Sequence, residues 1–118
     1  NWTTQVLTSD GAALFGTYWL GAQPWENPEL YWQQSPLSLV GAVETPTLVV
    51  VGAEDFRTPS SESEQFYTAL KLRGVPTALV KVPGASHNLA GRPSQSAAMA
   101  AAILAWFDKY RAGAAGAR

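Results

Sequence analysis

Two residues of this sequence have the side chains and the setting of an acid–base pair. Asp55 follows the apolar run Thr47-Leu-Val-Val-Val-Gly52, and His87, the only histidine, stands in a later loop after a second strand-like run. A carboxylate that binds one imidazole nitrogen fixes the tautomer of the ring, so the other nitrogen can take a proton from a hydroxyl. A general base placed in this way raises a rate by about 10²–10⁴. The pair therefore indicates nucleophilic catalysis, with a turn-forming aspartate and a packed or surface histidine as the alternative.

The elements that must hold this pair form a strand–helix–strand unit. A short apolar run bounded by turn residues is typical of a strand buried on both faces, and residues 47–51 fit this pattern. Thr58 is expected to cap the helix that follows and Gly74 to end it. Residues 76–82 are predicted to form a second strand, parallel to the first. Loops at the carboxyl ends of parallel strands commonly hold functional residues. Here they are the acid loop, which contains Asp55, and the histidine loop, which contains His87.

Helices are expected on either side of this unit. Residues 1–7 are consistent with the end of a strand and the loop that leaves it, and 11–20 with a short helix. Asn27 should cap a helix that begins at Pro28 and runs to Gln34. A last helix should run from about Ser94 to about Tyr110, and residues 111–118 should be a frayed tail.

The two predicted strands are too few to form a stable sheet by themselves. Two strands do not make a stable parallel sheet that is covered on both faces. We therefore expect residues 1–118 to be one segment of a single α/β domain, incomplete on its own. Either the remainder of that domain or a second copy of the chain is then the expected partner of the open sheet.

Composition excludes several classes of function. A net charge of −1 and 14% charged residues provide no basic surface for nucleic acid. With no cysteine and one histidine, neither a disulfide framework nor a typical zinc site is expected, and no cofactor is predicted. No apolar run approaches the roughly 20 residues that a membrane-spanning helix needs. The absence of cysteine is compatible with either cytoplasm or periplasm, so no compartment is assigned.

Motifs along nearly the whole chain resemble one known family. In order they are Asn1-Trp2, Pro24-Trp25-Glu26-Asn27-Pro28, Ser35-Pro36-Leu37, Thr45-Pro46-Thr47-Leu48, Gly52-Ala-Glu-Asp55-Phe-Arg57-Thr-Pro59, Ser63-Glu64-Gln65-Phe66-Tyr67-x-Ala69-Leu70, Gly74-Val75-Pro76, Pro83-Gly84 with His87, and Ile103-Leu104-x-Trp106-Phe107. Together they are similar to the C-terminal part of the catalytic domain of the prolyl oligopeptidase family of serine peptidases. The acylaminoacyl-peptidase-like and dipeptidyl-peptidase-like branches are the most similar. The resemblance implies an α/β-hydrolase fold.

The resemblance implies roles for four residues. Asp55, two positions before the arginine of its loop, matches the triad acid in preference to Glu54, and His87 matches the triad histidine. Arg57 matches a position where some members hold a substrate carbonyl, and its alternative is an ion pair with Glu54 or another acid. Trp2 matches an aromatic residue that walls the pocket for the residue before the scissile bond, and its alternative is core packing.

The nucleophile of such a triad is expected outside this sequence. The chain order in α/β-hydrolases is nucleophile, acid, histidine, and no Gly-x-Ser-x-Gly motif occurs in these 118 residues. The predicted function is therefore a serine peptidase segment that supplies the acid and the histidine for hydrolysis of short peptides or aminoacyl amides through an acyl-enzyme. Alone it is expected to be inactive. The alternatives are a carboxylesterase of the same fold and a non-catalytic interaction module on the same scaffold.

Overall fold

Two parallel strands form the centre of the fold. The computed structural model describes residues 1–89 and 91–115. Strand β1 (Thr47–Gly52) pairs with strand β2 (Thr77–Val82) residue by residue from one end to the other. Valine and threonine dominate both strands and suit a pleated, partly buried surface. The parallel pairing is confirmed, and both strands lie within one residue of the bounds expected from the sequence.

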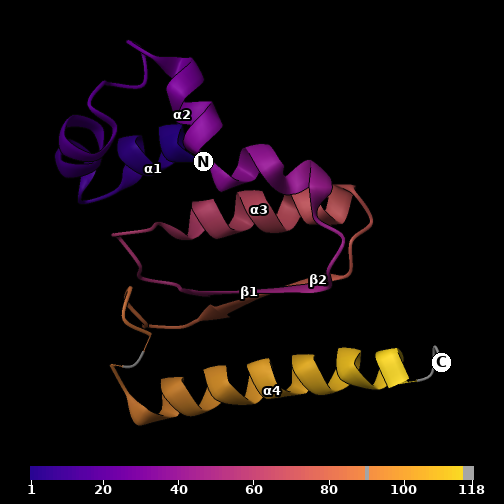
Figure 1. Ribbon diagram of the computed structural model, residues 1–118. Coiled ribbons are helices and arrows are strands. Elements are labelled where there is room, and N and C mark those ends of the chain that lie inside the picture. Colours follow the sequence, from indigo (N-terminus) through magenta and orange to yellow (C-terminus); the bar gives the residue numbers. More distant parts are fainter. Residues whose placement is uncertain (90, 116–118) are drawn as a thin grey trace.

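Helix α3 (Ser60–Leu72) is the crossover between the two strands and covers one face of the pair (Figure 1). It buries Leu70 completely and ends as expected, since Gly74 takes the left-handed conformation at φ 73°. The prediction that Thr58 caps this helix is wrong. The capping position is Pro59, and the backbone amide of Thr58 instead donates to the Asp55 carboxylate.

Helix α4 (Pro93–Ala115) lies on the opposite face of the strand pair (Figure 1). The indole N–H of Trp106 donates to the carbonyl oxygen of Pro46 at 3.4 Å, which ties the helix to the chain just before β1. The helix extends beyond the expected end, so residues 111–115 are helical where a frayed tail is expected. The last part of that expected tail, 116–118, lies outside the described residues. No helix in the described part of the chain is long and apolar enough to span a membrane.

The N-terminal part of the chain folds into four short helical segments. They are α1 (Trp2–Thr8), the π-helix η1 (Leu14–Leu20), α2 (Pro28–Gln34) and the 3₁₀ helix η2 (Pro36–Ala42). The α2 prediction is confirmed, with the Asn27 side chain accepting from the amide of Leu30 at 3.1 Å. The expectation of a strand end at residues 1–7 is wrong. The Asn1 side chain accepts from the amide of Thr3 and starts a helix there, as asparagine does well at this position.

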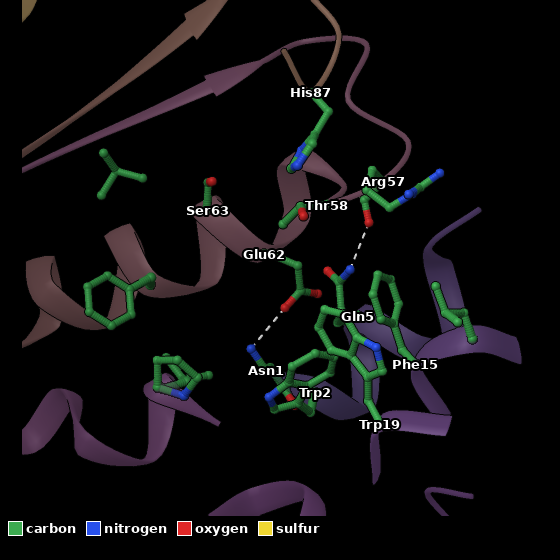
Figure 2. Close-up of a pocket in the computed structure, with 15 residues that line it drawn as sticks. Asn1, Trp2, Gln5, Phe15, Trp19, Arg57, Thr58, Glu62, Ser63 and His87 are labelled. Atoms are coloured by element: carbon green, nitrogen blue, oxygen red, sulfur yellow. Dashed lines mark hydrogen bonds and ion pairs between the residues drawn. The ribbon is translucent and has the colours of Figure 1, made fainter. Parts of the chain in front are cut away.

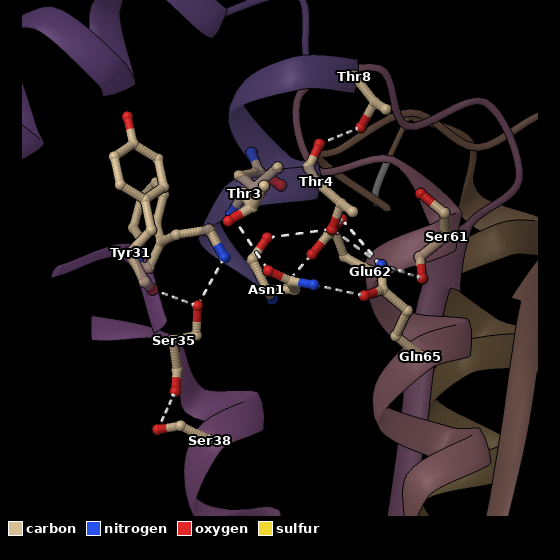
Figure 3. Close-up of polar contacts among 12 residues, drawn as sticks. Asn1, Thr3, Thr4, Thr8, Tyr31, Ser35, Ser38, Ser61, Glu62 and Gln65 are labelled. Atoms are coloured by element: carbon tan, nitrogen blue, oxygen red, sulfur yellow. Dashed lines mark hydrogen bonds and ion pairs between the residues drawn. The ribbon is translucent and has the colours of Figure 1, made fainter. Parts of the chain in front are cut away.

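A small apolar cluster joins these segments to one another, and a polar network joins them to α3. Val6, Phe15 and Tyr31 are buried together. The hydroxyl of Ser35 donates to the carbonyl oxygen of Tyr31 and accepts from the backbone of α1 (Figure 3). On the other side of α1, the hydroxyl of Thr4 donates to the Glu62 carboxylate, and the side-chain amide of Asn1 donates to Gln65 at 3.0 Å (Figure 3). The N-terminal segments are therefore fixed against the helix that follows the acid loop.

The described residues leave much apolar surface uncovered. Leu104 and Phe107 on α4 are each 64% exposed, and the sheet has only its two strands. The Cα radius of gyration is 16.3 Å, whereas a compact domain of this length has about 13–14 Å. The fold is an α/β arrangement with a small parallel sheet between helices, and it has open surface where further layers or strands can pack.

Candidate active site

The loops that follow β1 and β2 touch at one edge of the sheet. The amide of Ala53 donates to the carbonyl oxygen of Val82, and the amide of Glu54 to that of Ala85, both at 3.0 Å. This contact requires glycine at position 52, because a β-carbon there would lie 2.3 Å from the Ala85 carbonyl oxygen. The backbone of the second loop therefore rests directly on the end of β1.

This contact brings together the two residues singled out in the sequence. Nδ1 of His87 lies 2.9 Å from Oδ2 of Asp55. The other carboxylate oxygen, Oδ1, accepts from the backbone amides of Arg57 at 3.0 Å and Thr58 at 2.8 Å. Three hydrogen bonds thus fix a carboxylate whose side chain is only 6% exposed. Among the described residues, the side chain of Glu54 makes no hydrogen bond to His87.

The contact with Asp55 determines which nitrogen of the His87 ring carries the proton. A carboxylate only accepts hydrogen bonds, so with Asp55 ionised Nδ1 carries the shared proton and donates. In the neutral ring, Nε2 then keeps its lone pair, and the side chain is 61% exposed. The amide of Leu89 donates to the carbonyl oxygen of Ser86 at 3.1 Å and closes a turn around the histidine. Leu89 has φ 53°, a left-handed conformation that costs a non-glycine residue about 1–3 kcal/mol and is common at functional sites.

The side chain of Arg57 is paired with an acid from the N-terminal part of the chain. Its Nε atom donates to Oδ1 of Asp10 at 2.6 Å, and this hydrogen bond with its charge raises the pKa of Arg57 above its usual value. The expected alternative, an ion pair with another acid, is therefore present, and the partner is not Glu54. The backbone carbonyl of Arg57 also accepts from Gln5 at 2.7 Å and Ser9 at 2.6 Å. Helix α1 and the residues that follow it thus hold the acid loop in place through hydrogen bonds.

An aromatic pocket of about 700 Å³ opens beside His87 (Figure 2). The rings of Trp2, Phe15 and Trp19 meet edge to face along its wall, with centroids 5.0–6.1 Å apart. Trp2 packs against the apolar cluster and also lines this pocket. Arg57 lies at the edge of the same pocket. All four residues predicted for the site therefore lie in or beside one cavity.

Sequence reasoning missed three residues of this region. Phe15 and Trp19 stand four positions apart on one helical segment, a spacing that usually signals packing and gives no separate sign of a pocket. Asp10 reads as a helix cap in the sequence, and only the tertiary structure shows its pairing with Arg57. No local signal predicts a contact between residues 47 positions apart.

The described residues offer no metal centre. No three histidine, cysteine, aspartate or glutamate side chains gather as possible ligands within residues 1–89 and 91–115.

The sequence is similar to those of several known proteins. The model of the prolyl oligopeptidase family matches residues 1–113. The chain is 38% identical over 112 residues to the uncharacterized peptidase YuxL of Bacillus subtilis, covering 93% of this chain and 17% of that protein. It is 36% identical over 85 residues to the acylamino-acid-releasing enzyme of Arabidopsis thaliana, covering 72% of this chain and 11% of that protein.

A solved structure has the same fold. The acylaminoacyl peptidase of Pyrococcus horikoshii superimposes with a TM-score of 0.83 and 28% sequence identity. The match covers 91% of this chain and 18% of the other. The chain thus spans less than a fifth of the length of each of these relatives. The likeness confirms the α/β-hydrolase class.

Proposed function

This chain belongs to the prolyl oligopeptidase family of serine peptidases, and on that premise we propose that Asp55 and His87 are the acid and the histidine of its catalytic triad. One observation carries the proposal: the Asp55 carboxylate binds Nδ1 of His87 with one oxygen and two backbone amides with the other. An aspartate that only shaped a turn would need the amides alone. The additional contact with a half-exposed imidazole beside a pocket is what a general base requires.

The nucleophile in this proposal is a serine outside these 118 residues. The chain has no Gly-x-Ser-x-Gly motif and spans under a fifth of its relatives, which supports that assignment. Nε2 of His87 takes the hydroxyl proton as the serine oxygen bonds to the substrate carbonyl carbon. The same nitrogen then gives the proton to the leaving amine as the scissile bond breaks, and water repeats the sequence on the acyl-enzyme.

The pocket sets the proposed substrate class. An aromatic wall of Trp2, Phe15 and Trp19 suits an apolar side chain or acyl group at the residue before the scissile bond. Arg57, at the edge of the pocket, is proposed to donate to a carbonyl of the preceding residue. Short peptides and N-acylated residues present both features. The relative from Arabidopsis thaliana is named for release of acylamino acids, which is compatible with such substrates.

The open sheet and exposed apolar surface support the proposal that residues 1–118 are one segment of a single catalytic domain. The partner that completes the sheet is then the nucleophile-bearing remainder of the same protein. An isolated segment would lack the serine and would be inactive. A second copy of the chain is the alternative partner, and the oligomeric state of the isolated segment distinguishes the two.

The experiment that tests the function uses the full-length protein that contains this chain. Hydrolysis of an N-acetylated phenylalanine amide and of short peptides is compared with hydrolysis of p-nitrophenyl butyrate. We expect turnover of the amide and peptide substrates, lost in His87→Ala. Ester turnover without any amide or peptide turnover would identify a carboxylesterase instead, and the absence of both would favour a non-catalytic module.

A further inference from the structure

We propose that Asp10 is a positioning residue for Arg57, holding its guanidinium at the rim of the aromatic pocket so that the terminal nitrogens can donate to a substrate carbonyl. This inference rests on the proposed substrate contact of Arg57. Asp10 lies in the turn between α1 and η1, 47 positions from its partner in the sequence. Among the described residues its side chain makes no hydrogen bond or ion pair with Asp55 or His87, so the effect of removing its charge is expected to pass through Arg57.

The contact leaves most of the guanidinium available. Oδ1 of Asp10 accepts from Nε of Arg57 at 2.6 Å, which uses one of the five N–H donors of the group. The two terminal nitrogens have no hydrogen-bond partner among the described residues. The Arg57 side chain is 49% exposed and extends from the edge of the pocket away from His87 (Figure 2). The proposal places on this rim the residue that precedes the one whose side chain enters the pocket.

Hydrogen bonds hold both the backbone carbonyl and the side-chain Nε of Arg57. Its backbone carbonyl accepts from Gln5 and Ser9, and the amide of Asp10 donates to the carbonyl oxygen of Phe56 at 2.9 Å. Asp10 therefore binds the acid loop through both its backbone and its side chain.

Positioning explains the pair better than stability does. An ion pair in which both side chains are half exposed contributes little to folding stability, because water and salt screen it. Arginine is a long side chain with many rotamers, and one acceptor at Nε removes much of that freedom before substrate arrives. A donor held in place in advance binds its acceptor more tightly than one that must be ordered on binding.

The test compares substrates with and without the relevant carbonyl, using the full-length protein. Asp10→Asn keeps the backbone contact and the size of the side chain but removes its charge. We expect KM for an N-acetylated dipeptide amide to rise about 3–10-fold with kcat within about twofold, and p-nitrophenyl acetate turnover to be unchanged. Asp10→Glu should restore part of the loss, and Asp10→Asn should add nothing in an Arg57→Ala background.

Two controls separate positioning from structure. Glu44→Gln removes an exposed charge ahead of β1, far from the acid loop in the sequence, and should leave the KM for the peptide within about twofold. Glu54→Gln removes a nearby exposed charge and should do likewise. An unchanged or lower KM in Asp10→Asn, an equal effect on ester and peptide, or full additivity with Arg57→Ala would each overturn the proposal.

Separate measurements report on the proposed reaction and on the role of Asp10. Wild-type turnover and its loss in His87→Ala report on the reaction, whereas the Asp10→Asn comparison reports on Arg57. Binding of the same dipeptide amide by calorimetry, in a His87→Ala background, needs no turnover. We expect Asp10→Asn to raise that Kd about 3–10-fold, and an unchanged Kd would contradict the role of Asp10.

Discussion

The backbone carbonyl of Ala85 occupies the space that a side chain on Gly52 would need. A β-carbon at position 52 would lie 2.3 Å from that oxygen and 2.6 Å from the carbonyl oxygen of Ser86. Both atoms belong to the main chain of the histidine loop, so neither can move by a simple rotamer change. The distance between Asp55 and His87 therefore depends on the absence of a side chain at the end of β1.

Gly52→Ala should separate the two loops. We expect the full-length protein to lose about 1–3 kcal/mol of stability, as overpacked sites do, and to lose most of its activity because the histidine loop is displaced. Denaturant unfolding and turnover of the same preparation measure both effects. Gly41→Ala is the control, since a β-carbon there meets nothing within 4 Å. A Gly52→Ala protein with wild-type activity would contradict this account of the loop contact.

Asp55→Asn should lower kcat while leaving the fold in place. The amide of asparagine offers one acceptor where the carboxylate has two, so it cannot serve the backbone amides and the histidine equally well. We expect kcat to fall by about 10²–10⁴, and Glu54→Gln, which removes the neighbouring carboxylate, to change it less than about threefold. Steady-state kinetics on one amide substrate measure both. The reverse ranking of the two variants would identify Glu54 as the acid.

Trp19→Ala should change substrate preference more than the rate for small substrates. Its ring stands 5.0 Å from that of Phe15 and lines the pocket, so its removal widens the cavity. We expect kcat/KM for a phenylalanine amide to fall about 3–10-fold, and that for an alanine amide to stay within about twofold. Trp25→Ala is the matched control, because Trp25 is 71% exposed and lies outside the pocket lining. Equal losses for both substrates would argue against a side-chain pocket.

Tyr31 should make stability depend on pH at the alkaline end. Its ring is fully buried and its hydroxyl donates to the carbonyl oxygen of Ala22 at 2.7 Å. Burial, and secondarily the charge of Glu26, raise the pKa of Tyr31 above the usual 10.0. In the unfolded chain the phenol ionises at its ordinary pKa, so its stabilising contribution is present below pH 10 and is lost as pH rises through the higher folded value.

Denaturant unfolding between pH 8 and pH 11 checks this prediction. Tyr31→Phe should be less stable near pH 8 by about 1 kcal/mol, because the Ala22 carbonyl loses its donor. Its stability should then fall less steeply above pH 10 than that of the wild-type protein. The other tyrosines are present in both proteins, so the difference belongs to Tyr31. Parallel profiles for the two proteins would refute the prediction.

Much of the central unit is predictable from local sequence. Val49 and its apolar neighbours define β1, and Asn27 marks the start of α2, because strand burial and helix capping leave patterns over a few residues. The pairing of Asp55 with His87 follows from two loops at the same sheet edge. These features depend on short-range chemistry or on a simple rule of parallel sheets.

The features that were not predicted depend on tertiary contacts or lie at the ends of helices. Helix α1 has seven residues and no clear apolar periodicity. The Asn1 side chain caps its start, and Val6 packs against Phe15 and Tyr31, which are distant in the sequence. Thr58 has the side chain of a cap, but its amide donates to the Asp55 carboxylate and the capping position falls on Pro59. The pairing of Asp10 with Arg57 joins distant parts of the chain, which one sequence cannot reveal.

Labelling by a fluorophosphonate probe tests the central claim most directly. The probe reacts only with a serine whose hydroxyl is activated, so it reports the triad without any assumption about substrate. In the full-length protein we predict labelling of one serine outside these 118 residues, with His87→Ala and Asp55→Asn slowing it at least about 100-fold. Wild-type labelling that persists unchanged in His87→Ala, or no labelling at all, would contradict the proposal that Asp55 and His87 serve a serine nucleophile.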